Sequence, residues 1–163
     1  MFNNQIPEIQ ENQFQELLKI ATLSERRRYA KVLHSPGDEF NAVFNFTMNN
    51  SYMQPHLHPG LEKIEKIHLI HGKVAILFFD DNGIVEKCTI LKEAGKDMIQ
   101  VPAFTWHTYV MLTDYVVTYE TMMGVYNPHT WKKMADWAPR EGLNESSKYL
   151  DSLRMEVEKR LCR

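Results

Sequence analysis

Hydrophobic residues follow a helical period at both ends of the chain and a period of two in between. The end patterns predict one amphipathic helix over about residues 7–22 and another that closes the chain. The apolar positions that carry them are Phe14, Leu17, Leu18 and Ala21 at the first end, and Leu150, Leu153, Val157 and Leu161 at the second. Each helix therefore has one face that packs against something else.

The middle of the chain reads as a series of short β-strands. Between Tyr29 and Met122, short segments rich in β-branched and aromatic residues alternate with turn residues. The strongest hairpin signal is Asn82-Gly83, because both residues tolerate positive φ. Many short strands predict a sandwich or barrel. We expect a single domain over residues 1–163, with a helical segment at 1–24, a β-barrel at 26–124, and an extension with a helix at 125–163.

Composition narrows the partners. The chain has 163 residues, 44% of them hydrophobic, which is enough for a core. Its formal net charge of -2 argues against a nucleic-acid partner held by bulk electrostatics. The start has no signal-peptide pattern and the longest apolar run is too short to span a bilayer, so we expect a cytoplasmic protein with no membrane contact. Cys88 and Cys162 have no paired spacing and are expected to be free thiols.

Histidines are concentrated in the segment "QPHLHPGLEKIEKIHLIHG", residues 54–72, which holds four of the seven in the chain. In a strand, residues two apart face the same side, so Gln54, His56 and His58 would project together. Glu65 on the next strand and His107 on a later one can join them, with Tyr109 on the His107 side. Three imidazoles and a carboxylate predict a mononuclear metal site with open positions.

Other groups compete for these roles. Glu62 is a second candidate for the carboxylate ligand, but it precedes the predicted strand. His68 faces away from the ligands, while His71 at a turn and His129 in an irregular segment are expected to be solvated. The three tryptophans are interpreted as packing residues.

These residues resemble the metal motifs of the cupin superfamily, whose fold is a small β-barrel of jelly-roll type. The motifs are His56-x-His58, Glu65 followed by Gly72, and Pro102 before His107. The long spacing from His58 to Glu65 is similar to that of the WbuC family of cupin-fold metalloproteins. Further similar segments, from about Arg26 to the last helix, are "RRRYAKVLH", "SYMQPHLH", "LFFDDNG", "ETMMGVYNP" and "WAPREG".

The chain departs from the family pattern at a few positions. Phe104 stands where relatives usually carry glycine, in the turn before His107. Ala30 and Val32 replace asparagines of the first strand, and Gln54 stands where arginine is common. These changes affect the wall of the pocket more than the metal ligands.

Candidate substrate-binding and catalytic residues lie around the expected metal site. Arg28 and His34 share one face of the first strand and can bind substrate, although a charged edge strand explains the arginines equally well. Gln54 and Tyr126 are further substrate-binding candidates. The catalytic candidates are Tyr109 and Glu120, although Glu120 is equally consistent with a structural carboxylate paired with an arginine.

Three functions are compatible with such a site. The resemblance to WbuC proteins implies a sugar or sugar nucleotide in surface polysaccharide (O-antigen-like) biosynthesis, and hence a metal-dependent isomerase or epimerase. The same ligands suit an Fe(II)-dependent dioxygenase, and a non-catalytic sensor of a small molecule is the third. One divalent ion is expected, and imidazole and carboxylate suit zinc, iron, manganese and nickel alike. The expected partner is a carbohydrate-like ligand, and a homodimer is left open.

Overall fold

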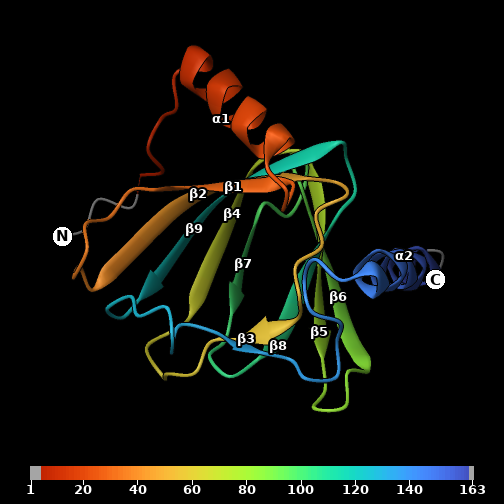
Figure 1. Cartoon of the computed structure of the whole chain (residues 1–163). Helices are drawn as coiled ribbons and strands as arrows, with labels where there is room; N and C mark the ends of the chain where they lie inside the picture. Colours follow the sequence, from red (N-terminus) through yellow and green to blue (C-terminus); the bar gives the residue numbers. More distant parts are fainter. Residues whose placement is uncertain (1–4, 162–163) are drawn as a thin grey trace.

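The computed structural model describes residues 5–161 as two facing antiparallel β-sheets with a helix near each end (Figure 1). The helices are α1 (Glu11–Leu23) and α2 (Asn144–Leu161). The first sheet contains, in spatial order, β1 (Arg28–Val32), β2 (Phe40–Met48), β9 (Tyr115–Met123), β4 (Glu65–His71) and β7 (Met98–Val101). The second contains β10 (Lys133–Met134), β3 (His56–Leu57), β8 (Trp106–Met111), β5 (Lys73–Phe79) and β6 (Val85–Lys92).

The strand order is that of a jelly roll. The first sheet contains the run β2-β9-β4-β7 and the second the run β3-β8-β5-β6, so the chain crosses repeatedly between the sheets. Such an order pairs early strands with late ones, as two Greek keys do. The prediction of a mainly β, cupin-type jelly roll with an N-terminal and a C-terminal helix is confirmed.

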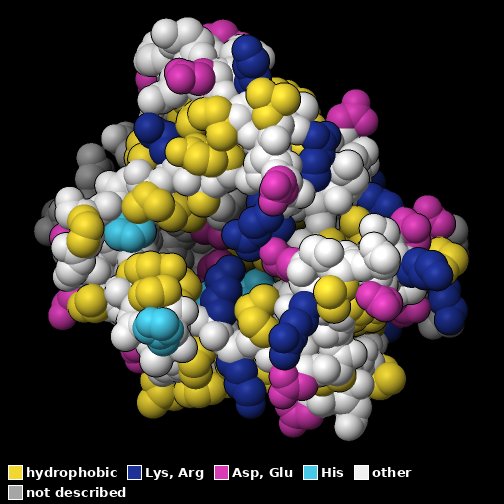
Figure 2. All heavy atoms as spheres, in the orientation of Figure 1, with side chains coloured by type: hydrophobic (Ala, Val, Ile, Leu, Met, Phe, Trp, Pro, Cys, Tyr) yellow, Lys and Arg dark blue, Asp and Glu magenta, His cyan; other side chains and the backbone are white. Residues whose placement is uncertain are grey.

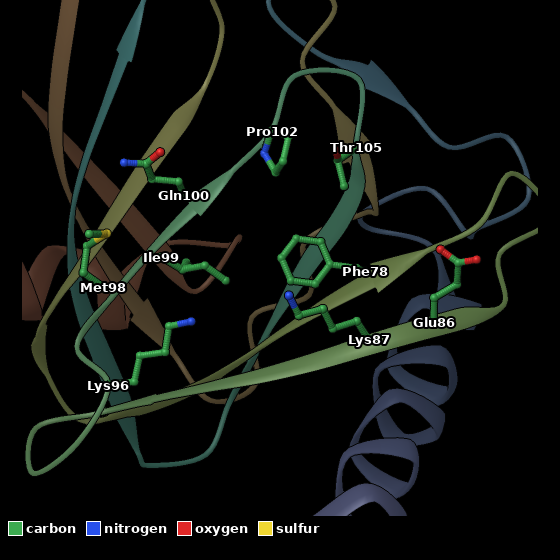
Figure 3. A pocket seen from close by; sticks show the side chains of 9 residues that line it. All are labelled: Phe78, Glu86, Lys87, Lys96, Met98, Ile99, Gln100, Pro102 and Thr105. Atoms are coloured by element: carbon green, nitrogen blue, oxygen red, sulfur yellow. The ribbon is translucent and has the colours of Figure 1, made fainter.

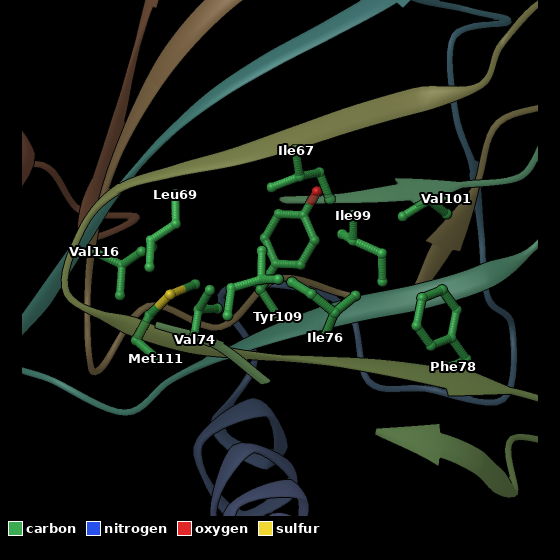
Figure 4. Packing of buried hydrophobic residues seen from close by; sticks show 11 residues of the cluster. Ile67, Leu69, Val74, Ile76, Phe78, Ile99, Val101, Tyr109, Met111 and Val116 are labelled. Carbon is green, nitrogen blue, oxygen red and sulfur yellow. The ribbon is translucent and has the colours of Figure 1, made fainter. Parts of the chain in front are cut away.

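Each sheet packs a helix on its outer face, as the amphipathic patterns predict. On α1, Leu17 and Ala21 pack with Phe44 of β2, and on α2, Leu153 and Val157 join the cluster that covers the second sheet. The space between the sheets is filled by a third apolar cluster, seen in Figure 4. Strand alternation separates these layers, since side chains two apart along a strand face the same side.

The hairpin predicted at Asn82-Gly83 joins β5 to β6. The side chain of Asp80 accepts hydrogen bonds from the amides of Asn82 and Ile84, at 2.9 and 2.8 Å. Gly83 has a φ of 82°, which glycine adopts without steric cost. Turn chemistry alone therefore located this connection correctly.

Several strand boundaries differ from those predicted. The segment expected as a strand over residues 51–58 forms only the two-residue β3, because Pro55 has no amide to donate to a neighbouring strand. Strand β1 ends at Val32, so His34 lies beyond it. Strand β10 was not predicted, and it pairs Met134 with His56.

Phe104 occupies a backbone conformation that favours glycine. Its φ is 59°, in the left-handed region, and its side chain is 54% exposed. Phe104 lies three residues before His107, and its amide donates a hydrogen bond to the carbonyl of His58 at 3.0 Å. The turn before His107 therefore keeps the left-handed conformation that glycine favours, although Phe104 adopts it with strain.

This strain gives a stability prediction. We expect Phe104→Gly to be about 1 kcal/mol more stable than Phe104→Ala, because both remove the exposed ring but only glycine relieves the left-handed conformation. Urea-induced unfolding followed by circular dichroism measures the difference. Equal stability of the two variants would contradict the strained conformation.

Two expectations from composition meet the structure directly. Cys88 in β6 is a free thiol, while Cys162 lies outside the described residues. Within residues 5–161, neither helix combines the length and the apolar character needed to cross a membrane.

Candidate metal centre

Three buried histidines converge at one end of the space between the sheets. His56 and His58 lie at and just after β3, and His107 of β8 stands directly opposite His56 in the strand register. The ring centroids of His56 and His107 are 4.5 Å apart, and those of His56 and His58 are 5.2 Å apart. One ligand nitrogen from each histidine lies within 4.8 Å of the others, so the three side chains can hold one metal ion.

Backbone carbonyls hold all three rings in the same tautomer. Each Nδ1 faces a carbonyl oxygen, which can only accept, so Nδ1 carries the proton. The distances are 3.0 Å from His56 to Gln54, 2.9 Å from His58 to Trp131 and 2.8 Å from His107 to Thr105. Each Nε2 is thereby left with its lone pair, which is the arrangement found for histidine ligands of metals.

Glu65, the first residue of β4, places its carboxylate among these rings. Its Oε2 lies 3.0 Å from Nε2 of His107 and 3.6 Å from Nε2 of His58. Burial opposes ionisation, but the contacts with His107 and His58 outweigh it, so the pKa of Glu65 lies well below its usual range. Burial also holds the pKa of His56 well below 6.5, which keeps that ring neutral. A buried carboxylate beside three imidazoles is a set of ligand atoms that suits a divalent cation.

The fit to a metal ion can be tested on the polar atoms of the site. Nε2 of His58 is buried and has no hydrogen-bond partner among the described residues. Nε2 of His107 and Oε2 of Glu65 lie 3.0 Å apart, a contact that either a proton or a metal ion between the two atoms satisfies. The residues present therefore fit a divalent ion. Glu62, the competing carboxylate, is exposed in the turn before β4.

A cavity of about 570 Å³ opens beside the three histidines and contains several of the predicted residues. Its lining comes from β1, β2, β4 and β9, from Arg26 just before β1, and from the segments that follow β1, β3 and β9. Figure 2 shows a hollow near the middle of this face, with carboxylates and imidazole deep inside it and basic side chains at its opening. Among the predicted residues, His58, Glu65, Glu120, His34 and Tyr126 line the cavity.

Glu120 is a buried carboxyl at the inner face of β9. The hydroxyl of Thr118 donates a hydrogen bond to it at 2.7 Å. Burial and the nearby charge of Glu65 raise the pKa of Glu120 to about 8. It is therefore protonated at neutral pH and can hold or transfer a proton beside the cavity.

Tyr109 lies deeper than a substrate-contacting residue. Its ring centroid is 6.0 Å from that of His107, and its hydroxyl interacts with Glu65. Figure 4 places the ring within the apolar cluster, among Ile67, Ile76 and Ile99. Burial raises its pKa well above 10, as do the charges of Glu120 and Glu65, so it remains a phenol that can orient the carboxylate of Glu65.

The structure does not bring Arg28 or Gln54 to the cavity. The guanidinium of Arg28 is 2.5 Å from Glu141 and also donates to the carbonyl of Tyr52. The side-chain amide of Gln54 donates to the carbonyl of Ala135 at 2.9 Å. Because residues 51–55 are not a strand, Gln54 does not share a face with the histidines.

Two of the cavity residues that the sequence did not indicate lie in the segment after β9. Trp131, interpreted from sequence as a packing residue, lines the cavity, and its ring centroid lies 5.2 Å from that of Tyr126. Lys132 beside it was not considered. Both belong to an irregular segment after β9, where hydrophobic periodicity gives no signal. The one sequence feature that pointed to this segment was the cluster of aromatic and basic residues in "HTWKKM", which follows the strand of Glu120.

A second open hollow, of about 580 Å³, lies between β6 and β7 (Figure 3). Its lining includes Lys87, Lys96 and Glu86, together with apolar residues such as Phe78 and Met98. It contains no histidine and a single carboxylate, so it lacks the groups that hold a metal ion. The chemistry is concentrated in the cavity beside the histidines.

Comparison with known protein families assigns the chain to one of them. A family described as "Domain of unknown function (DUF6016)" matches residues 9–91, about half of the sequence. The chain belongs to this family. The DUF6016 match includes His56, His58 and Glu65 but ends before His107. No curated protein matches the sequence.

Solved structures share the fold at low identity. A Shewanella oneidensis protein is similar with a TM-score of 0.54 and 10% identity, over 74% of this chain and 82% of that one. A chain from the crystal structures of the DMSP lyases RdDddP and RnDddQII is similar with a TM-score of 0.52 and 15% identity, over 68% of this chain and 53% of that one. This chain thus spans about half of that protein. A cupin 2 conserved barrel domain protein from Rhodopseudomonas palustris has a TM-score of 0.48 and 13% identity, over 66% and 64%.

Proposed function

We propose that this DUF6016 protein is a metal-binding cupin similar to the WbuC family, and that it acts on a sugar or sugar nucleotide as an isomerase or epimerase. The observation that carries the proposal is the donor set, in which Nε2 of His58 and His107 lie 3.6 and 3.0 Å from Oε2 of Glu65 and His56 completes the group of three histidines. The adjoining cavity has room for a small molecule.

The surrounding residues support proton transfer rather than simple binding. A bound divalent ion would polarise a carbonyl or hydroxyl of the ligand. Glu120 holds a proton at its carboxyl beside the cavity, and Thr118 fixes the orientation of that carboxyl. The buried hydroxyl of Tyr109 interacts with Glu65 and can orient its carboxylate. This arrangement provides one proton carrier beside the site of an electrophile, as an isomerase or epimerase requires.

The first test is metal stoichiometry. Protein purified without a nickel column is expected to contain about one divalent ion per chain. His107→Ala is expected to lose most of that ion, because His107 is the ligand that strand β8 contributes. The matched control is His129→Ala, since His129 is exposed in an irregular segment. Elemental analysis by mass spectrometry measures the ion. Full occupancy in His107→Ala would contradict the assignment of the centre.

A further inference from the structure

Lys132 brings a positive charge into the candidate cavity from the segment after β9. The residue is exposed and lines the cavity together with Glu65 and Glu120, and its charge interacts with both carboxylates. The lysine therefore lies near the three histidines without being able to serve as a ligand while it is protonated.

Lys132 differs from the other basic residue of the cavity. Arg26 forms an ion pair with Glu141 at 2.9 Å. Lys132 forms neither an ion pair nor a hydrogen bond within residues 5–161. An ammonium group that lines a cavity and has no direct partner is available to bind an anion. The ligand itself can supply that partner.

The charge of the metal-loaded cavity favours an anion. A divalent ion would share the carboxylate of Glu65 with the histidines, which removes much of the negative charge that now faces Lys132. The combined positive charge of such an ion and Lys132 exceeds the negative charge of Glu65 and Glu120 together, even with both ionised. A ligand that carries an anionic group would restore the balance.

Trp131 adds an aromatic surface beside the ammonium. Its ring lines the cavity, with the ammonium of Lys63 5.0 Å from the ring centroid and Tyr126 edge-on at 5.2 Å. Lys63 is itself fixed by a hydrogen bond to the carbonyl of Thr130 at 3.0 Å. An indole held in this way offers an apolar face to a ligand ring, with a cation in the next residue.

We propose that Lys132 binds an anionic group, phosphate or carboxylate, of a sugar whose ring packs on Trp131. The proposal rests on the proposed function, because it takes the ligand to be a sugar that reaches the metal centre. It makes Lys132 a residue that determines specificity for charged over neutral sugars.

Calorimetric titration of the metal-loaded protein tests the proposal, with glucose 6-phosphate, galacturonate, inorganic phosphate and neutral glucose as probes. We expect at least one charged sugar to bind more tightly than glucose, and Lys132→Met to weaken that binding by roughly tenfold or more. Lys132→Arg is expected to keep most of the affinity. The matched control is Lys133→Met, because the ammonium of Lys133 lies over the ring of Trp106 and does not line the cavity.

A second readout uses the metal alone. Lys132→Met is expected to raise the affinity for a divalent ion several-fold, because it removes a positive charge that faces Glu65, whereas Lys133→Met should not. Equal effects of the two variants on both readouts, or no charged probe bound more tightly than glucose, would overturn the proposal. A wild-type protein that holds no metal would instead refute the proposed function, and anion binding by Lys132 would then be measured on the metal-free protein.

Discussion

Glu65→Gln is expected to weaken the binding of a divalent ion by roughly 100-fold or more, whereas Glu62→Gln is expected to leave it close to wild type. The two substitutions remove the same charge only three residues apart. Glu65 is buried, with Oε2 3.0 Å from Nε2 of His107, whereas Glu62 is exposed in the preceding turn. The difference in environment therefore predicts the difference in effect.

Competition with a chromophoric chelator measures both affinities on the same scale. Glu62→Gln serves as the matched control for loss of a negative charge from this part of the chain. Because glutamine retains the size of glutamate, a loss of binding in Glu65→Gln reflects the donor atom and its charge. Equal effects of the two substitutions would mean that the carboxylate acts only through long-range electrostatics.

Strand alternation predicted the inward direction of Glu65 and His107 because both residues lie in regular strands. Glu65 begins β4 and shares its inner face with Ile67, while His107 lies in β8 with Tyr109 two residues later. Glu120 lies two residues after Thr118 on the inner face of β9, as predicted. In these strands a period of two assigns each side chain to a face, and the fold brings those faces together.

The wall of the cavity was harder to predict because it depends on irregular backbone. Gln54 was expected beside the histidines, but Pro55 interrupts the strand and the side chain binds Ala135 instead. The segment that contains Trp131 and Lys132 has no periodicity. The hydrogen bond from this segment to His58 uses the backbone carbonyl of Trp131, and such a contact cannot be inferred from the type of amino acid.

The segment of residues 131–135 also helps to position His56 and His58. Met134 pairs with His56, and the amide of Ala135 donates to the carbonyl of Pro55 at 2.8 Å. Together with the contact between Trp131 and His58, these bonds hold the short strand β3 between β8 and β10. The candidate ligands His56 and His58 are thus positioned by residues far along the chain from the histidine motif, which is why the motif alone does not specify the cavity.

Glu120→Gln is expected to retain the metal ion but to lose turnover of a keto-sugar or sugar nucleotide under anaerobic conditions. The proposed donor set consists of the three histidines and Glu65, so replacing Glu120 leaves it intact. Burial and the charge of Glu65 raise its pKa to about 8, which gives it a proton to hold or transfer near neutral pH. Glutamine keeps the shape and the hydrogen bond from Thr118 but cannot transfer a proton.

The same substitution has a signature in the pH dependence of stability. In the metal-free protein, the unfolded carboxyl titrates near its ordinary value of 4.5, whereas the folded one titrates at about 8. The folded state thus binds more protons between these values, so this residue makes the free energy of unfolding fall as pH rises from about 4.5 to about 8. Glu120→Gln should lack that decrease in urea unfolding measured across this range, and an unchanged pH profile would place the raised pKa elsewhere.

Turnover separates the isomerase from the competing functions. Product formation is followed by nuclear magnetic resonance without oxygen, with Glu120→Gln compared with Glu62→Gln as the exposed control. An activity that requires oxygen and ferrous iron, is inhibited by zinc and survives Glu120→Gln would identify a dioxygenase instead, because that reaction depends on a redox-active ion rather than on this proton carrier. Tight binding of a sugar without any product would leave the metal and Glu120 as parts of a sensor, in which the ion only holds the ligand.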